Sequence, residues 1–336
     1  MKLITVTDMQ ALIRRVGLEP FLALAVDAIE DYLRRWPELQ LSPRHAFHYP
    51  FGVTELMPCA DDRLYGVKYV NGHPGNPARG KLSVTAIGLL ADVPSGYPLM
   101  ISEMTLLTAV RTAAVAALAA GLLARLESQR VALIGCGAQA EFQVLALASR
   151  LPVTEVNYFD IDGAAMDKFA GHLGHRFRLR RGQDIADTLR DADVWITLTA
   201  AKQHQSLIDE ALLRPGVHIN AMGGDCPGKT ELSPEVIRRC KTVVEYRPQS
   251  EQEGEIQQTG AASVHAELWE VLTNQRPGRD NDDEITLFDA VGIAVEDLAV
   301  LDLVARLAER YDIGSEVTLV PDLTDPKDLF ALVAGN

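Results

Sequence analysis

The chain has 336 residues, 47% of them hydrophobic, and a formal net charge of −14 at pH 7. At roughly 150 residues per domain, this length predicts two domains. The acidic residues are spread along the chain, which disfavours nucleic acid and membrane surfaces as partners. The four cysteines lack metal-ligand spacing and the N-terminus lacks the apolar stretch of a signal peptide, so we expect a cytoplasmic protein without a metal site.

Two helices are predicted at the start of the chain. Thr7 and Gln10 have the spacing of a capping box, which places the first helix start at Thr7. Gly17 should end that helix. Pro20 suits the first turn of a second helix, which should reach about Arg35.

The segment 44–104 changes to strands and turns. Side chains alternate through 47–53 and 64–70, and 91–97 reads as a hairpin turn, so we expect an antiparallel region. Residues 104–125 then form an Ala-rich helix. Because its apolar run is shorter than the roughly 20 residues of a membrane span, we expect this helix to be buried.

A glycine-rich turn joins a short apolar strand, 131–134, to a helical pattern that continues to about residue 150. Gly135 permits a tight turn, Gly137 lets the backbone approach a pyrophosphate, and Ala140 lets the helix pack on the strand. Asp160 ends the next strand, roughly 20 residues on, where such folds bind a ribose. Together these features predict a Rossmann-type site for NAD, with the phosphates at the helix N-terminus.

Strands alternate with helices from this point on, which is typical of a doubly wound parallel sheet. Ligands of such sheets bind at the carboxyl ends of the strands, so 199–200, 221–225 and 289–292 should converge on the glycine loop. The predicted strands are 131–134, 155–160, 194–197, 217–222, 242–245 and 285–288.

The expected fold class is therefore α/β, with a Rossmann-type NAD-binding domain at 119–311. We expect a separate mixed α+β domain at 1–118. The last helix should run from near Gly292 to about Tyr311. The remaining segment, 312–336, is strand-like at 317–320 and should return to the first domain.

Four charged residues of the first domain stand out: Arg44, Glu55, Lys68 and Arg111. Arg44 and Lys68 fall on predicted strands. Buried cations need partners or an anionic ligand, and the planar guanidinium matches a carboxylate. Glu55 could bind an ammonium. The alternative interpretation is that these residues are solvated strand edges and salt bridges within the domain.

Asp225 is the candidate acid or base of the second half. It lies in the loop GGDCPGKTEL, where the flanking glycines allow close approach of a small ligand. The alternative is a turn aspartate that caps a helix near Glu231.

Long segments of the chain resemble the ornithine cyclodeaminase/mu-crystallin family nearly end to end, and its bacterial members most closely. The resemblance implies a homodimer that joins its N-terminal sheets and an enzyme that uses NAD catalytically. The activity implied is conversion of L-ornithine to L-proline and ammonia, through an imine and internal ring closure. The segments are FGVTELMPCADDRLYGVKYVNGHP, ADVPSGYPL, EMTLLTAVRTAA, LIGCGAQAEFQ, NAMGGDCPGKTEL, EGEIQQ and FDAVGIAVEDL.

Position by position, the resemblance makes Asp225 the catalytic acid/base and Glu55 the ligand of the distal amine. Two departures are visible: Ser83 stands where we expect Thr, and Ala290 where relatives carry Ser. The implied substrate contacts are Arg44, Glu55, Lys68, Arg111 and the Val291 carbonyl. The implied cofactor contacts are Ser83, Arg111, Thr112, Gly135, Gly137, Ala138, Gln139, Asp160, Thr199, Ala221, Met222, Lys229 and Ala290.

Two other functions remain open on the sequence. One is net redox chemistry within the same family, as in an NAD-dependent amino-acid dehydrogenase or a cyclic-imine reductase. The other is a ligand-binding protein without enzymatic activity. A complete acid/base and carboxylate-binding set argues against the second, because a pure binding protein need not keep Asp225.

Overall fold

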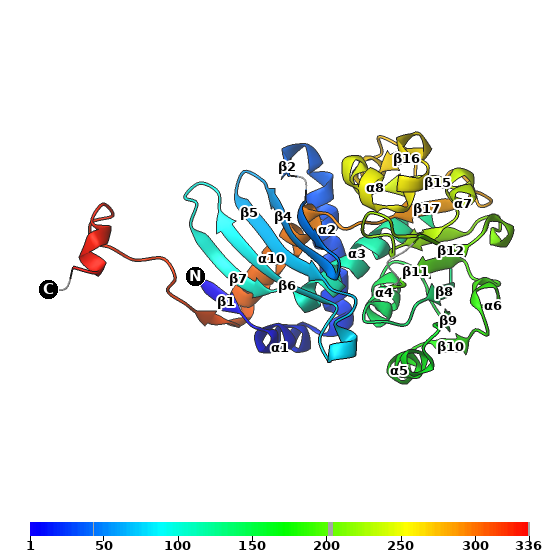
Figure 1. The fold of residues 1–336 in the computed structure, drawn as a ribbon, viewed down its shortest axis with the longest axis horizontal. Coiled ribbons are helices and arrows are strands. Elements are labelled where there is room, and N and C mark those ends of the chain that lie inside the picture. Colours follow the sequence, from blue (N-terminus) through cyan, green and yellow to red (C-terminus); the bar gives the residue numbers. More distant parts are fainter. Residues whose placement is uncertain (43, 201–203, 335–336) are drawn as a thin grey trace.

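The computed structural model describes residues 1–42, 44–200 and 204–334, which form two α/β units side by side (Figure 1). The first unit is built on an eight-stranded sheet. In spatial order its strands are β18 (Ser315–Glu316), β1 (Lys2–Ile4), β7 (Pro98–Glu103), β6 (Val84–Asp92), β5 (Leu64–Gly72), β4 (Gly52–Ala60) and β2 (Gln40–Leu41), with β3 (His45–Tyr49) also paired to β4.

Three helices cover one face of this sheet or lie beside it: α2 (Leu18–Arg34), α3 (Thr105–Leu123) and α10 (Ala294–Tyr311). The strands alternate in burial as the sequence predicts, since Met57, Lys68 and Leu90 point to the covered face and are buried. The opposite face is apolar but exposed, at Leu56 and Ile87 among others. The antiparallel region and the β6–β7 hairpin are therefore confirmed.

Two local predictions in this unit are wrong. Helix α1 (Val6–Val16) starts before Thr7, because Thr5 is its N-cap and shares a capping box with Asp8. The alternation through 47–53 does not form one strand either. Residues 50–51 turn the chain back, so β3 and β4 form an antiparallel hairpin.

Helix α3 connects the two units, and it packs against α2 and β6 on one side and against α4, β13 and β17 on the other. It is long and apolar enough to cross a membrane by composition, but 72% of its most apolar window is buried inside the protein. The expectation of a buried core helix is confirmed.

The second unit has an eight-stranded sheet in which every pairing is parallel. All the predicted strands are present, and β10 and β16 extend the sheet at its two edges. In spatial order the strands are β10 (Arg178–Arg181), β9 (Glu155–Phe159), β8 (Arg130–Ile134), β11 (Val194–Thr197), β13 (His218–Ala221), β17 (Thr286–Asp289), β15 (Lys241–Val244) and β16 (Val264–Glu267).

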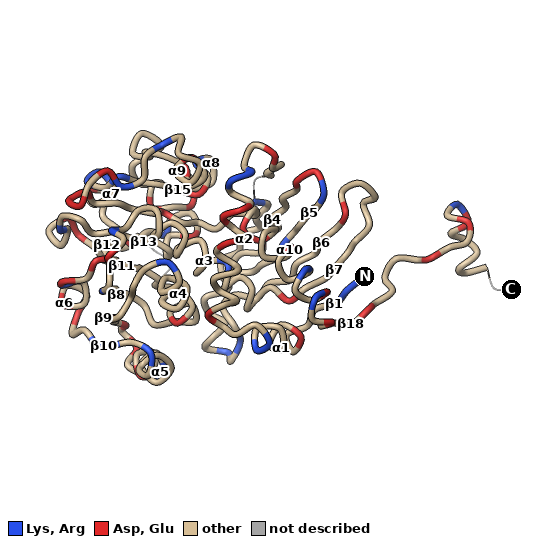
Figure 2. Tube along the Cα trace, turned by 180° about the vertical axis from the view of Figure 1, so that it is seen from behind, with Lys and Arg blue, Asp and Glu red and all other residues tan. Residues whose placement is uncertain are grey.

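Short helices and a small two-stranded sheet complete the second unit. The helices are α4 (Ala140–Leu147), α5 (Gly163–Leu173), α6 (Ile185–Leu189), α7 (Pro234–Arg239), α8 (Arg247–Glu253) and α9 (Leu268–Leu272), and the extra strands are β12 (His204–Ile208) and β14 (Thr230–Leu232). Acidic and basic residues are interspersed along both units (Figure 2).

The end of the chain returns to the first unit. Helix α10 packs on α2 and across β4, β5 and β6, so its contacts favour grouping it with the first sheet. After it, β18 pairs with β1 at 315–316, and 317–320 is not the strand that we expected. The chain beyond β18 runs away from both units (Figure 1). The exact domain boundaries remain a prediction.

Candidate active site

Four neighbouring strands of the second sheet, β8, β11, β13 and β17, end at the same edge. Their last residues are in register, with Ile134 opposite Thr197, Thr197 opposite Ala221, and Ala221 opposite Asp289. The loops that follow, 135–139, 198–200, 222–225 and 290–292, are therefore neighbours. This is the convergence that the sequence predicts for a doubly wound sheet.

The glycine loop after β8 has the form of an anion cradle. Gly135 has φ +104°, and a Cβ on it would lie 2.9 Å from the Leu198 carbonyl oxygen. A Cβ on Gly137 would meet no atom within 4 Å, so this side of the loop is open to a ligand. Helix α4 begins after Gln139, which makes no side-chain cap, and the Ala140 N–H donates to the Gly137 carbonyl at 3.4 Å. The N-terminus of a helix that follows a glycine loop suits phosphate oxygens.

Asp160, which follows β9, binds the backbone of this loop. Its carboxylate accepts hydrogen bonds from the backbone N–H of Cys136 at 2.6 Å and of Asp162 at 2.9 Å. Arg181, at the end of β10, reaches the same edge, since its guanidinium lies 3.3 Å from where a Gly163 Cβ would be. It forms an ion pair with Asp167 at 2.7 Å. The sequence next to Asp160 gave no sign of this cation.

Lys68 and Arg111 are buried together at the start of α10. The Lys68 ammonium donates to Asp297 at 2.8 Å, and Arg111 pairs with Glu296 at 2.7 Å and lies 3.5 Å from Asp297. Burial, followed by the positive charge of Arg111, lowers the pKa of Lys68 to about 8. Burial opposes the charge on Arg111, but Asp297 and Glu296 outweigh it and raise the pKa of this guanidinium.

Arg44 joins both units. It lies just before β3, not on a strand as we expected, and its side chain is only 8% exposed. It donates to Glu55 at 3.1 Å and to the carbonyl oxygens of Val291 at 2.9 Å and Gly292 at 2.8 Å. Arg44 therefore meets Glu55 and Val291, two of the predicted substrate contacts.

The three cations are not solvated strand edges, because each is buried. The ion-pair part of the alternative interpretation does hold, since each cation has an acidic partner. Those partners do not use all the donors, however. Among the described residues, the Nε atoms of Arg44 and Arg111 are buried without a hydrogen bond, although they lie 3.5 Å from the carboxylates of Glu253 and Asp297, respectively. Such donors are costly unless a ligand or solvent meets them.

Asp225 lies in the loop after β13 and pairs with Lys229 at 3.0 Å. Its side chain is 58% exposed, whereas that of Lys229 is 7% exposed. The alternative of a helix cap near Glu231 is wrong, because 230–232 form β14 and the next helix, α7, is capped by Ser233. The structure therefore leaves this carboxylate beside the strand ends, with a buried ammonium as its partner.

Most of the remaining predicted cofactor residues lie on the same edge. The N–H of Thr199 donates to Glu231 at 2.7 Å, that of Met222 to the Thr197 carbonyl at 3.1 Å, and that of Ala290 to the Ala221 carbonyl at 3.1 Å. Ala138 lies in the glycine loop, and Thr112 follows Arg111 on α3. Ser83 precedes β6 in the first unit, where its carbonyl accepts from the His73 N–H at 2.7 Å.

Sequence reasoning missed a group of buried carboxylates that surrounds these residues. Glu245 accepts from the N–H groups of Val291 and Gly292 at 2.9 and 2.5 Å and so shapes the loop after β17. Burial raises the pKa of Glu253 to about 7, and that of Glu296 well above its usual value. The only signal for Glu253 and Glu296 was their place in EGEIQQ and FDAVGIAVEDL.

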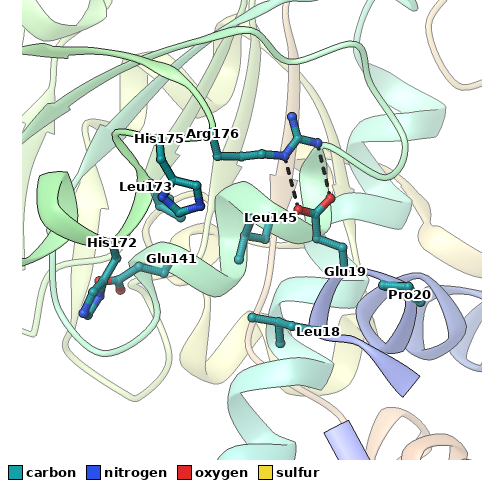
Figure 3. A pocket seen from close by; sticks show the side chains of 9 residues that line it. All are labelled: Leu18, Glu19, Pro20, Glu141, Leu145, His172, Leu173, His175 and Arg176. Atoms are coloured by element: carbon teal, nitrogen blue, oxygen red, sulfur yellow. Dashed lines mark hydrogen bonds and ion pairs between the residues drawn. The ribbon is translucent and has the colours of Figure 1, made fainter. Parts of the chain in front are cut away.

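A pocket of about 590 Å³ lies elsewhere, between the start of α2 and helices α4 and α5 (Figure 3). Arg176 crosses it to Glu19, with both contacts at 3.2 Å, so it links the two units. None of its lining residues is a predicted site residue. Among the described residues, no cluster of His, Cys, Asp and Glu could hold a metal ion.

The fold and site define a two-unit protein with a dinucleotide-type cradle beside a buried set of charges. The model of the ornithine cyclodeaminase/mu-crystallin family matches residues 6–310. The chain is 46% identical over 331 residues to an ornithine cyclodeaminase of Agrobacterium tumefaciens (strain Ach5), covering 98% of this chain and 93% of that relative. This chain therefore belongs to the ornithine cyclodeaminase/mu-crystallin family.

Solved structures agree with this membership. A lysine cyclodeaminase, described in its recognition of L-lysine, L-ornithine and L-2,4-diamino butyric acid, superposes with a TM-score of 0.93 at 29% identity, covering 99% of each chain. An archaeal alanine dehydrogenase, described as a dimer with bound NAD, superposes with a TM-score of 0.88 at 32% identity, covering 95% of this chain and 99% of that one.

Proposed function

We propose that this protein is an ornithine cyclodeaminase, which converts L-ornithine to L-proline and ammonia with NAD as a catalytic cofactor. The observation that carries the proposal is the buried charge set. Arg44, Lys68 and Arg111 provide positive charge for one carboxylate, while Glu55 lies at hydrogen-bond distance from Arg44. A site with both signs of charge suits a diamino acid. The full-length similarity to a named ornithine cyclodeaminase supports the same conclusion.

The residues of the strand-end loops fit NAD. Gly135, Gly137 and Gln139 would hold the pyrophosphate at the N-terminus of α4, and Asp160 the adenosine ribose. NAD held by these residues would supply reversible hydride transfer at the substrate Cα. The other cofactor contacts that we propose are Ser83, Arg111, Thr112, Ala138, Thr199, Ala221, Met222, Lys229 and Ala290.

The chain's own residues would orient the substrate. The guanidinium groups of Arg44 and Arg111, with the Lys68 ammonium, would hold the α-carboxylate by charge-assisted hydrogen bonds, and the Nε donors of the two arginines are hydrogen-bonded to no described residue. Glu55 holds the distal ammonium, and the Val291 carbonyl accepts from the α-amine. Together these two contacts would hold the distal nitrogen close to Cα. This nitrogen can attack Cα and close the ring once it has lost its proton.

Asp225 would carry the protons. The α-amine must be neutral before hydride leaves Cα, because the developing cation needs the nitrogen lone pair. The Asp225 carboxylate can accept that proton and can return it to the departing ammonia. Lys229 pairs with this carboxylate at 3.0 Å. Arg44 and Arg111 cannot accept a proton at neutral pH.

The assembly that we propose is a homodimer in the cytoplasm, formed through the exposed face of the first sheet. Leu56, Tyr69 and Ile87 stand in a row across β4, β5 and β6 and are 46%, 44% and 56% exposed. A row of large apolar side chains on a sheet face is typical of an interface. The dimer would leave the strand-end loops free.

The main alternative is a net redox enzyme, and the similarity to an alanine dehydrogenase is the observation that favours it. The two functions differ in where the hydride goes. The test incubates the protein with L-ornithine and a trace of NAD⁺, then quantifies proline by mass and NADH by absorbance. A cyclodeaminase makes many equivalents of proline per NAD⁺ with no steady rise of NADH. NADH that accumulates in step with the loss of ornithine would support the dehydrogenase instead.

A further inference from the structure

Arg44 lies between two carboxylates that come from different units of the protein. Its Nη1 atom is 3.1 Å from Glu55 on β4, and its Nε atom is 3.5 Å from Glu253 at the end of α8. All three side chains are nearly buried, with exposed fractions of 8%, 10% and 11%. The Oε2 atom of Glu253 has no hydrogen-bond partner among the described residues.

The position of Glu253 is fixed by its neighbours. The next residue, Gly254, packs so closely on Asp289 that a Cβ there would lie 2.4 Å from the carboxylate. Asp289 also accepts from the N–H of Glu255 at 2.9 Å. The end of α8 is therefore anchored to the end of β17, next to the loop that carries Val291. Glu253 consequently faces the site from the second unit, opposite Glu55.

We propose that Glu253 is a specificity-determining residue, which shares with Glu55 the task of selecting substrates that carry a second, distal ammonium. The proposal rests on the proposed function and extends it to a residue outside the family-implied site. In the free protein the two carboxylates neutralise Arg44. In the complex, the substrate's carboxylate pairs with Arg44. The substrate's distal ammonium then replaces Arg44 as the cation between Glu55 and Glu253.

This exchange favours diamino acids because a monoamino acid would leave buried carboxylates unpaired. A diamino acid brings one carboxylate and one distal ammonium, so both ion pairs that it breaks are replaced. A monoamino acid occupies Arg44 but leaves Glu55 and Glu253 without a cation. Buried carboxylates without a partner are costly, so the analogue is rejected more strongly than the loss of one contact would suggest. A site with buried charged groups discriminates well against ligands that leave them unpaired.

The charges around Glu253 add a pH dependence. Burial raises the pKa of Glu253 to about 7, while Arg44 lowers it and the nearby Glu55 and Asp225 raise it further. Gln249, on the same helix, opposes the rise by hydrogen bonding. Above this pH Glu253 is ionised, so a monoamino acid leaves the buried charge of Glu253 unpaired. The preference for ornithine should therefore increase as the pH rises through about 7.

The test compares L-ornithine with L-norvaline, which has the same carbon chain and no distal amine. Their dissociation constants with the NADH-bound protein, which cannot accept the Cα hydride, are measured for wild type, Glu253→Gln, Glu55→Gln and the double variant. Glu251→Gln is the matched control, because Glu251 is exposed on the same helix. We expect Glu253→Gln to reduce the ornithine-to-norvaline affinity ratio about tenfold or more, since a hydrogen bond to a charged group is lost. The control should keep the wild-type ratio.

The affinity for norvaline should stay the same or improve in Glu253→Gln, which separates selection from general damage to the site. An unchanged ratio, or an equal loss for both ligands, would overturn the proposal. If Glu253→Gln fails to fold, the wild-type ratio between pH 6 and pH 8 decides, and a flat ratio would refute it. Wild-type protein that makes no proline would instead refute the proposed function.

Discussion

Lys68 and Asp297 are 229 residues apart in sequence, and their side chains meet at 2.8 Å in the interior of the protein. Lys68 comes from the middle of β5 and Asp297 from the first turn of α10. Arg111 of α3 lies 3.5 Å from the same carboxylate. Lys68, Arg111 and Asp297 therefore link β5, α3 and α10. The pair also holds the Lys68 ammonium beside the expected site of the substrate carboxylate.

The first prediction concerns the pH dependence of substrate affinity. Burial and Arg111 lower the pKa of Lys68 to about 8, so its ammonium is charged below this pH and neutral above it. Its attraction for a carboxylate should be present below about pH 8 and lost as the pH rises further. The ratio of ornithine affinities of wild type and Lys68→Met should fall above pH 8. This ratio cancels the titration of the substrate itself, and a ratio constant from pH 7 to 9.5 would contradict the assignment.

Arg44→Ala should weaken substrate binding far more than cofactor binding. A hydrogen bond to a charged group contributes about 1.5–3 kcal/mol, which corresponds to roughly ten- to a hundredfold in affinity. Calorimetric titration with ornithine and, separately, with NAD⁺ gives both numbers. Wild-type affinity for ornithine would return Arg44 to a structural role that links Glu55 to the loop after β17.

Asp225→Asn should preserve the fold and NAD binding but reduce turnover on the order of a hundredfold or more, because the amide cannot accept the α-amine proton. Lys229, left with a neutral partner, keeps the nearby charge of Glu231, so little destabilisation is expected. Proline formation and NAD⁺ affinity are measured on the same preparation. A variant with near wild-type rate would show that the base lies elsewhere.

The cofactor should be NAD(H) rather than NADP(H). The Asp160 carboxylate would accept hydrogen bonds from the ribose hydroxyls and repel a 2′-phosphate. Arg181 reaches the same edge but is paired with Asp167, so it offsets this repulsion only in part. Michaelis constants for the two cofactors provide the test, and Asp160→Ser should narrow the difference between them. Comparable constants in the wild type would refute the assignment.

Much of the second unit could be predicted from the sequence because its signals are local. The dinucleotide-binding motif places glycines after one strand and an acidic residue after the next, as at Gly135, Gly137 and Asp160. The buried strands are short apolar runs. Edge strands β10 and β16 escaped prediction because their side chains are partly exposed and polar, as in Arg178–Arg181. The cap at Thr5 was missed because Asp8, rather than a Glu or Gln, completes the box.

The charge pairing of the site could not be predicted, since it depends on contacts between distant segments. Nothing near Lys68 in the sequence indicates Asp297, and nothing near Arg44 indicates Glu253. The position of α10 could not be predicted for the same reason. Its apolar stripe predicts a helix, but it does not indicate which of the two sheets the helix packs on. Resemblance to the family marked Arg44, Lys68 and Arg111, and only the fold reveals that acids from α8 and α10 surround them.

The most direct measurement of the central claim follows the hydrogen on the substrate Cα. Ornithine labelled with deuterium at C2 is incubated with the protein and a trace of unlabelled NAD⁺, and the proline is analysed by mass and NMR. If the hydride leaves and returns within one active site, proline retains the deuterium at C2 and NADH does not accumulate. Proline that has lost the label, or deuterated NADH formed in proportion to ornithine consumed, would contradict a cyclodeaminase.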